Sequence, residues 1–293
     1  MSATRSPSMR SKLFVPGSRP ELFEKAWESA ADAISFDLED AVAEDRKAEA
    51  RGYVAQALEH RAKSGKVAIV RVNPWGEPLF ADDLQAVVRP GLDIVNLPKV
   101  ESAEPILETA RLLDRLEREN GLDRRVGILA NIETPRGLRM VAEIALCHER
   151  VIGLQLGFGD LFEPLAIERS PLALAPVRLA VRLAAAEAGI DAYDGAFVGV
   201  SDGEAFRIDA EAGRALGLAG KSCIHPSQIS IANAVFFPRA AEIENARRIV
   251  AKAEEMLARG VGAFMVDGVM ADGPFIDRAR ALLRIAEGTG HHA

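Results

Sequence analysis

The sequence predicts a (β/α)₈ TIM-type barrel, an α/β fold, followed by a C-terminal helical extension. Short apolar runs alternate with stretches of helical periodicity, an order typical of parallel sheets covered by helices. Several runs end on charged or polar residues, as AISFDLED does at Asp37, Glu39 and Asp40. Functional residues gather at the carboxyl ends of barrel strands, so this placement predicts a site as well as a fold. A length of 293 residues suits one barrel with an appendage.

Eight apolar runs could form the strands of one barrel. The first three are KLFVPG at 12–17, AISFDLE at 33–39 and VAIVRVN at 67–73. Residues 102–118 place Ile106, Ala110 and Leu113 at helical spacing, so they predict a helix between the fourth and fifth strands. Eight such units favour a closed barrel over an open doubly wound sheet. The other five expected strands are 94–99, 126–133, 151–158, 190–197 and 220–226.

The pattern changes after Phe237 and Pro238, which predicts the end of the barrel. Residues 239–260 carry an amphipathic helix pattern, and the apolar run GAFMV, a loop and a final helix at 274–287 follow. We therefore expect a catalytic barrel domain at 10–237 and a helical extension at 238–290. Because the extension is too small to fold alone, it should pack on its own barrel or on a neighbouring subunit.

Composition excludes several classes of protein. Hydrophobic residues make up 48% of the chain, and no apolar run approaches the roughly 18 residues that a membrane span needs. A net charge of −7 argues against nucleic acid as a partner and favours small molecules. The polar opening MSATRSPSMR lacks the apolar segment of a secretory signal, so we expect a cytoplasmic protein. Two cysteines, Cys147 and Cys223, are too few for a disulfide framework or a structural zinc site.

Glu133 and Asp160 stand at the ends of consecutive predicted strands. In a barrel their carboxylates would lie on one rim about one strand spacing apart. That arrangement suits Mg²⁺, which proteins hold with one or two carboxylates while water and substrate oxygens fill the other positions. Alternatively, each carboxylate caps the following helix or pairs with an arginine such as Arg136. Position alone leaves both readings open.

Two basic residues end strands on the same predicted rim. A guanidinium at Arg71 suits bidentate capture of a substrate carboxylate. It could instead form a salt bridge with Glu39 or Asp40, and Lys99 has the same two readings.

Three further residues are weaker candidates for chemistry. Arg10 and Arg19 flank the first strand and could anchor phosphate groups, although exposed basic residues are usually only solvated. His225 could act as an acid or base, but a histidine at a barrel end is more often part of the hydrogen-bonded structure.

Ordered motifs are spread over nearly the whole chain: RSKLFVPGSRP, DAISFDLEDAV, RVN, LPKVE, NIETPRGL, GFGDL, GKSCIHPSQI and VDGVMADGP. With them the chain resembles the citrate lyase β-subunit family, within the HpcH/HpaI aldolase and malyl-CoA lyase superfamily. Members of that family are barrels that use Mg²⁺ to cleave or form a carbon–carbon bond between a 2-oxo acid and a thioester. The resemblance therefore implies an oxo-acid lyase with Mg²⁺ as its cofactor.

The resemblance also implies roles for single residues. Glu133 of IET and Asp160 of GDL would bind the metal, and Arg71 of RVN would hold the 2-oxo acid carboxylate and stabilise developing charge. Position at a strand end, rather than the resemblance, makes Lys99 a further candidate substrate contact. The acid/base aspartate of the family's GxMxDxP motif falls on Asp272.

Other implied features lie around this centre. Glu39 and Asp40 of DLEDAV would hold in place the residues that contact the metal and the substrate. The basic first motif implies that Arg10 and Arg19 contact the phosphates of coenzyme A. In related enzymes the tail lies over the active site of a neighbouring subunit. We therefore expect a homo-oligomer, a trimer or hexamer, whose extension packs on a neighbour.

Four functions remain open at this point. The first is a stand-alone lyase that cleaves a malyl-, citramalyl- or citryl-CoA type of 3-hydroxyacyl-CoA into an acyl-CoA and a 2-oxo acid. The second is the β subunit of a citrate lyase complex that acts on citryl-acyl carrier protein. The third is a pyruvate aldolase without coenzyme A, against which the motif around Asp272 speaks. The fourth is a metal-binding regulatory subunit without turnover, which the retained catalytic residue types disfavour.

Overall fold

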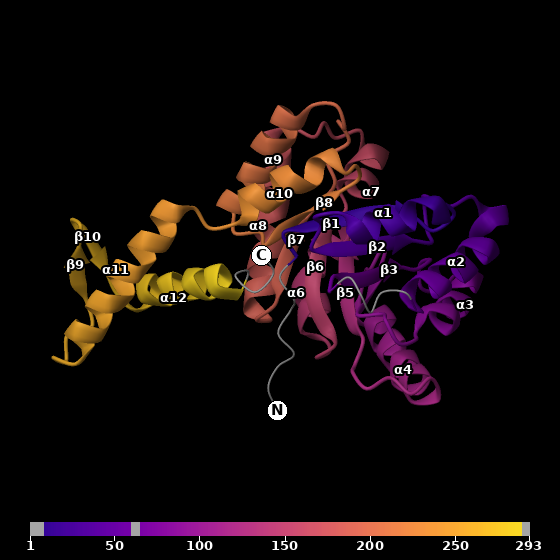
Figure 1. The fold of residues 1–293 in the computed structure, drawn as a ribbon, viewed down its shortest axis with the longest axis horizontal. Helices are drawn as coiled ribbons and strands as arrows, with labels where there is room; N and C mark the ends of the chain where they lie inside the picture. Colours follow the sequence, from indigo (N-terminus) through magenta and orange to yellow (C-terminus); the bar gives the residue numbers. More distant parts are fainter. Residues whose placement is uncertain (1–8, 60–64, 289–293) are drawn as a thin grey trace. The chain divides into compact units, whose positions relative to one another are not determined.

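The computed structural model describes residues 9–59 and 65–288. Among these residues, eight parallel strands form a closed barrel in the order β1 to β8, and β8 pairs with β1 (Figure 1). This confirms the predicted fold class. The strands are β1 Ser11–Pro16, β2 Ala33–Asp37, β3 Val67–Arg71, β4 Ile94–Leu97, β5 Gly127–Ile132, β6 Val151–Leu156, β7 Asp191–Asp194 and β8 Gly220–Cys223.

Each strand ends one to three residues before the expected boundary. The expected strands included the polar residues that follow each apolar run. In the structure the hydrogen bonds between strands end earlier, where the chain turns toward the next helix. Asn73, for example, lies beyond β3 and donates its side-chain amide to the Leu38 carbonyl oxygen at 3.1 Å. The residues that carry chemistry therefore lie at strand ends or in the loops after them.

Helices cover the outside of the barrel (Figure 1). In α4, Ala103–Glu119, the buried face carries Ile106, Ala110 and Leu113, the spacing that the sequence predicted. The other helices of the barrel unit are α1 Phe23–Glu28, α2 Lys47–Glu59, α3 Pro78–Val87, α5 Pro135–Arg139, α6 Val141–Leu146, α7 Phe158–Phe162, α8 Pro171–Glu187, α9 Gly203–Ala215 and α10 Ser227–Phe236. Short 3₁₀ turns lie at Pro20–Leu22, Glu44–Arg46 and Glu163–Leu165.

Alternate residues of each strand face opposite sides of the barrel wall. Side chains such as Ile34, Phe36 and Val70 face outward into the main apolar core beneath the helices. A separate apolar cluster fills the amino-terminal end of the barrel interior, so this end is closed. It consists of Met9, Ala33, Ile69, Ile94, Leu129, Ile152 and Tyr193.

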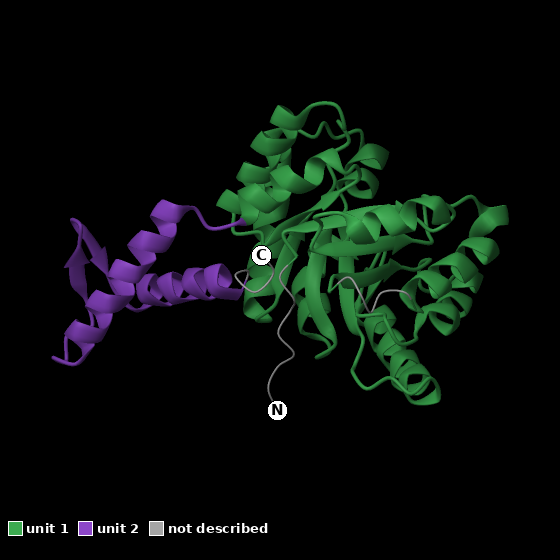
Figure 2. Ribbon diagram, in the orientation of Figure 1, with its two compact units in different colours: residues 1–236 green, residues 237–293 purple. Residues whose placement is uncertain are grey.

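The chain divides into two units, residues 1–236 and residues 237–293 (Figure 2), next to the boundary at 237/238 that the sequence suggested. The second unit contains α11 Ala240–Leu257, the strands β9 Phe264–Val266 and β10 Val269–Ala271, and α12 Gly273–Gly288. The side chains of Ala253, Phe264, Ala271 and Ile276 form its own small apolar core. We describe the two units separately.

The second unit contains a hairpin that sequence analysis did not predict. Strands β9 and β10 pair antiparallel around Asp267 and Gly268, both of which have positive φ, 49° and 80°. An Asp-Gly pair with this backbone is a tight hairpin turn, and the sequence signal for it was present in MVDGVM. No helix in the described parts of the chain is long and apolar enough to span a membrane.

Candidate active site at the carboxyl end of the barrel

Charged side chains from five consecutive strands meet at the carboxyl end of the barrel. Asp37 and Arg71 end β2 and β3 and are direct partners in the strand register. Lys99 and Glu133 follow β4 and β5, and Asp160 lies in the first turn of α7 after β6. The parallel topology thus brings these predicted residues of the barrel unit to one rim.

Arg71 is held mainly by Asp37, which sequence analysis did not pair with it. Its Nε and Nη2 donate to the two Asp37 carboxylate oxygens at 2.7 and 2.6 Å, a bidentate pair. Its Nη1 lies 2.7 Å from Glu39 Oε2 and 3.4 Å from Asp40 Oδ2, so the salt-bridge reading is also present. These contacts account for at most four of the five guanidinium N–H groups, so one donor remains for a ligand.

The pKa of Arg71 reflects these neighbours. Burial alone would lower it, but the attraction of Asp37, its hydrogen bonds and the charge of Glu39 together raise it. Arg71 is therefore a permanent cation at the rim.

Lys99 links three carboxylates. Its ammonium lies 2.6 Å from Glu39 Oε1 and 3.6 Å from Asp40 Oδ1. Its backbone N–H donates to Glu133 Oε1 at 2.7 Å. Lys99 adopts a positive φ of 52°, which is uncommon outside glycine and marks a constrained position.

Glu133 is a buried carboxylate, 1% exposed. Besides the Lys99 N–H, it accepts a hydrogen bond from Asn131 Nδ2 at 3.3 Å on Oε2. Burial raises the pKa of Glu133 to about 7; Arg71 opposes this rise, and Glu39 adds to it. Among the described residues, these hydrogen bonds of Glu133 come from Lys99 and Asn131 and not from Arg136.

Gly157 makes room for Glu133. A Cβ atom at position 157 would lie 2.1 Å from Glu133 Oε2 and 2.6 Å from its Cβ, so a side chain there would displace the carboxylate. The glycine also directly precedes α7, which carries Asp160 into the same region. The close approach explains why the GFGD motif begins with glycine.

The donor set fits a hard divalent cation. Five carboxylates (Asp37, Glu39, Asp40, Glu133, Asp160) face two cationic side chains at this rim, so the cluster carries excess negative charge. In the described parts of the chain no cluster of three or more His, Cys, Asp or Glu side chains could enclose a metal. Mg²⁺ does not need such a cage, because it keeps several water or substrate ligands. Glu133 and Asp160 are the residues that could hold it.

The two amino-terminal arginines lie at different ends of the barrel. Arg10 precedes β1 at the amino end of the strands and forms a bidentate pair with Asp32, with both contacts at 2.8 Å. This position, a strand length away from Arg71, does not support the expected phosphate contact. Arg19 follows β1 at the carboxyl end, is about half exposed and pairs with Glu21. It remains available to an anion at that rim.

Two other candidates are placed as follows. His225 is exposed, and its Nδ1 lies 2.8 Å from Ser227 Oγ at the start of α10, which agrees with a structural role. Asp272 lies in the second unit, directly before α12. Its Oδ1 atom is buried and has no hydrogen-bond partner among the described residues.

A cavity of about 310 Å³ adjoins the charged rim next to Lys99. Trp75 and Arg136 line it, and sequence analysis gave neither a binding role. Both follow a strand by only a few residues, which is the signal that could have identified them.

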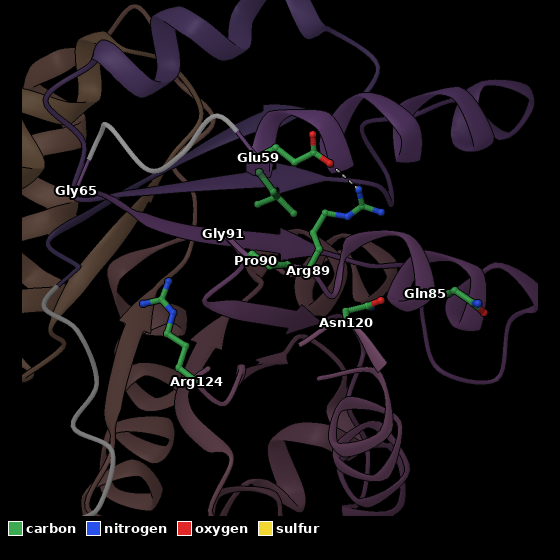
Figure 3. A pocket seen from close by; sticks show the side chains of 9 residues that line it. Glu59, Gly65, Gln85, Arg89, Pro90, Gly91, Asn120 and Arg124 are labelled. Carbon is green, nitrogen blue, oxygen red and sulfur yellow. Dashed lines mark hydrogen bonds and ion pairs between the residues drawn. The ribbon is translucent and has the colours of Figure 1, made fainter. Parts of the chain in front are cut away.

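A larger cavity of about 790 Å³ lies at the opposite, amino-terminal end of the strands (Figure 3). Its arginines are engaged: Arg89 contacts Glu59 at 3.2 Å, and Arg124 contacts Asp93 at 2.5 Å. Barrel enzymes carry their sites at the carboxyl end, so we assign the candidate site to the rim around Glu133. The lining residues are Leu58, Glu59, Gly65, Gln85, Arg89, Pro90, Gly91, Asn120 and Arg124.

Comparisons with known proteins show the family of the chain. Residues 10–226 match the sequence profile described as HpcH/HpaI aldolase/citrate lyase. The chain is 39% identical to the citrate lyase subunit beta of Escherichia coli (strain K12) over 289 residues, 98% of this chain and 96% of the relative. It is also 39% identical to a (3S)-malyl-CoA thioesterase of Cereibacter sphaeroides (strain ATCC 17029) over 287 residues, 97% of each chain.

Solved structures give the same result. Protein CitE from Mycobacterium tuberculosis in complex with magnesium, acetoacetate and coenzyme A has a TM-score of 0.76 at 31% identity, covering 98% of this chain and 100% of that one. The citrate lyase beta subunit from M. tuberculosis complexed with oxaloacetate and magnesium has a TM-score of 0.65 at 33% identity, covering 79% and 98%.

Proposed function

The chain belongs to the HpcH/HpaI aldolase/citrate lyase family, and on this premise we propose that it is a magnesium-dependent carbon–carbon lyase. Its substrate would be a 3-hydroxyacyl-CoA of the malyl-, citramalyl- or citryl-CoA type, and its products an acyl-CoA and a 2-oxo acid. The observation that carries the proposal is the rim where buried Glu133, Asp160 and the Arg71 guanidinium meet. The relatives crystallised with magnesium and with coenzyme A or oxaloacetate support the class of ligand.

Each residue of the rim has a defined task in this proposal. Glu133 and Asp160 would hold Mg²⁺, which when bound supplies positive charge to the substrate oxygens. Arg71 would use its remaining N–H to bind the carboxylate of the 2-oxo acid portion and would stabilise charge on the neighbouring oxygen. Lys99, Glu39 and Asp40 would keep Arg71 and Glu133 in place through the contacts described above.

Cleavage requires two proton movements. The hydroxyl group gives its proton to the Asp272 carboxylate, the carbon–carbon bond breaks, and its electron pair forms the thioester enolate while the carbonyl of the 2-oxo acid forms. The enolate carbon then takes up a proton, which we assign to Asp272 as general acid. The Asp272 Oδ1 atom supports this role, because it is buried and has no hydrogen-bond partner among the described residues. It is therefore available to bind a proton or a substrate group. Closure of the tail over the rim would exclude water.

Oligomerisation is part of the same proposal. The second unit has only a small apolar core of its own and exposes large apolar side chains such as Met265, Met270 and Phe275. We propose that it packs on a neighbouring copy in a trimer or hexamer. Light scattering coupled to size-exclusion chromatography measures this state directly.

Two other functions remain candidates because of particular relatives. The citrate lyase subunit beta of E. coli favours a subunit that acts on citryl-acyl carrier protein. The C. sphaeroides relative named a malyl-CoA thioesterase favours hydrolysis of a CoA ester. A pyruvate aldolase without coenzyme A is disfavoured by the tail that carries Asp272.

One assay separates these functions. The purified full chain is incubated with malyl-CoA, citramalyl-CoA, citryl-CoA and citryl-acyl carrier protein, with and without Mg²⁺, beside Glu133→Ala and Asp272→Asn. Magnesium-dependent release of a 2-oxo acid, lost in both variants, supports the lyase and identifies its substrate. Release of the free hydroxy acid with coenzyme A identifies a thioesterase. Turnover of citryl-acyl carrier protein alone identifies a citrate lyase subunit.

A further inference from the structure

The interior of the barrel changes character along its axis. The apolar cluster that contains Ala33 and Leu129 fills the amino-terminal end, and the charged rim lies at the carboxyl end. Along β2, Ala33, Ser35 and Asp37 follow one another on the same face, so Ser35 lies between the two layers. Barrel interiors are usually filled by bulky branched side chains, but this middle layer is polar. It consists of Lys12, Ser35, Asn96, Gln155 and Ser222.

The five side chains of this layer face the barrel axis. Their neighbours along the strands, such as Leu13, Val95 and Leu154, belong to the outer core beneath the helices. The strand register places Lys12 directly beside Ser222. Gln155 lies beside Tyr193, whose ring centroid is 5.4 Å from Lys12 Nζ. Lys12, Ser222 and Gln155 are therefore connected through neighbouring positions of the barrel wall.

Every member of the layer has a buried polar atom without a hydrogen-bond partner among the described residues. Lys12 is 1% exposed, and the rings of Phe14 and Tyr193 lie near its ammonium. Burial lowers the pKa of Lys12 to about 7; Cys223 opposes this shift and Arg71 adds to it. The atoms are Lys12 Nζ, Ser35 Oγ, Asn96 Oδ1, Gln155 Oε1 and Ser222 Oγ.

Burying such groups without partners is costly, most of all for an ammonium group. Buried polar atoms that lie together are normally bridged by ordered water, and each such water makes about three hydrogen bonds. The chemistry of the layer selects water over an ion. A cation would be repelled by Lys12, and an anion by the carbonyl-type oxygens of Asn96 and Gln155. Water both donates and accepts hydrogen bonds.

We propose that the barrel interior below Glu133 is a water-binding chamber, in which ordered water molecules bridge Lys12, Ser35 and Ser222 to Asn96 and Gln155.

The chamber is connected to the candidate metal ligand by side-chain amides. Asn96 Nδ2 donates to Asn131 Oδ1 at 2.6 Å, and Asn131 Nδ2 donates to Glu133 Oε2 at 3.3 Å. Asn96 Nδ2 also donates to the Leu129 carbonyl oxygen at 3.0 Å, and a water that donates to Asn96 Oδ1 adds to the contacts that fix this orientation. If the Asn96 side-chain amide rotated by about 180°, its oxygen would face Asn131 Oδ1, so the Asn131 amide would rotate as well. Asn131 would then present its oxygen to the Glu133 carboxylate. Asn96 and Asn131 are thus positioning residues for Glu133, and this link rests on the proposed function.

A crystal structure of the full chain at a resolution that shows ordered water is the first test. We expect water within hydrogen-bond distance of Lys12 Nζ and of at least two of the four other atoms. An interior without water, or direct pairing of these side chains with one another, overturns the proposal.

Variants test the same point in solution by oxygen-17 magnetic relaxation dispersion, which counts long-lived internal water. Lys12→Met and Ser222→Ala should each lose at least one such water. Ser11→Ala is the matched control, because Ser11 is a buried β1 serine on the outer face that bonds Asn233 at 2.6 Å. Equal water counts in Ser222→Ala and Ser11→Ala contradict the chamber.

The link to the metal has a separate readout. Asn96→Leu should weaken Mn²⁺ binding, measured by electron paramagnetic resonance, by roughly tenfold or more, as outer partners of metal ligands do. Unchanged Mn²⁺ affinity in Asn96→Leu overturns the positioning role. Failure of the wild-type chain to bind Mn²⁺ overturns the proposed function instead, and the water counts are unaffected.

Discussion

The backbone N–H of Lys99 donates to Glu133 Oε1 at 2.7 Å while Lys99 itself holds a φ of 52°. The unusual backbone angle and the hydrogen bond belong together, because the turn after β4 aims this N–H at the carboxylate. The ammonium of the same residue contacts Glu39 at 2.6 Å. One residue therefore orders two carboxylates of the site through different groups.

This relationship predicts different stabilities for two variants that lose the same ammonium group. Lys99→Gly relieves the left-handed backbone strain, whereas Lys99→Ala keeps it. Lys99→Gly should therefore be more stable to urea by about 1 kcal/mol. Both variants retain the N–H that contacts Glu133. Equal unfolding free energies would show that the backbone at this position carries no strain.

Gly157→Ala should weaken metal binding while the chain stays folded. The added Cβ would overlap Glu133 Oε2, from which it would be only 2.1 Å away, so the carboxylate must move. We expect a loss of roughly 10- to 100-fold in Mn²⁺ affinity, measured by electron paramagnetic resonance. Gly159→Ala is the control, because its Cβ would meet only Arg169 Nη2 at 3.4 Å. Retained affinity in Gly157→Ala would mean that Glu133 is not a ligand.

Sequence patterns predicted the barrel because strand order, strand ends and helix periodicity are local features. The parallel-strand rule likewise brought Glu133 and Arg71 to the same rim of the barrel. The pairing of Arg71 with Asp37 was missed, since it depends on the register between β2 and β3. The expectation for Arg10 failed for a similar reason. Residues 10 and 19 flank the same strand, but one lies at each end of it.

The polar interior also escaped sequence analysis. Lys12 opens an apolar run, KLFVPG, and nothing in that run marks its side chain as buried. Closure of the barrel buries it instead, because β8 pairs with β1 and encloses its side chain. Such a position depends on contacts between residues about 210 positions apart, here Lys12 and Ser222, which local periodicity does not encode.

Metal affinity should fall as the pH drops through 7. The pKa of Glu133 is raised by burial to about 7, so at lower pH a proton competes with the cation for this carboxylate. Between pH 8 and pH 6 the ionised fraction falls roughly tenfold, and the Mn²⁺ affinity should fall by a similar factor. Calorimetric titration at the two pH values measures it. In Glu133→Gln, any residual binding should lose this dependence; an unchanged pH dependence would assign it to another group.

Lys12 should make the protein more stable as the pH rises from 7 to 10.5. Its pKa is lowered by burial from 10.5 to about 7, so in this window the unfolded chain binds more protons than the folded chain. Stability therefore increases with pH across the window, and Lys12→Met should flatten this increase. Urea unfolding at pH 7, 8 and 9 tests it, with exposed Lys25→Met as the control. Equal slopes in Lys12→Met and wild type would contradict the shifted pKa.

Mixing two inactive variants tests whether the extension acts on a neighbouring copy. Glu133→Ala destroys the barrel site, and Asp272→Asn destroys the tail carboxylate, so each pure variant should be inactive. If the tail reaches a neighbour, random mixed oligomers contain intact pairs of an Asp272→Asn barrel and a Glu133→Ala tail. Equal mixing should then restore roughly one quarter of the wild-type activity. The barrel of a site carries Glu133 with a probability of about one half, and the neighbouring tail carries Asp272 with the same probability. Subunits are exchanged by mild denaturation and refolding, and wild-type protein treated in the same way gives the reference rate. No recovery in the mixture, with full recovery of the wild type, would place Asp272 over the barrel of its own chain.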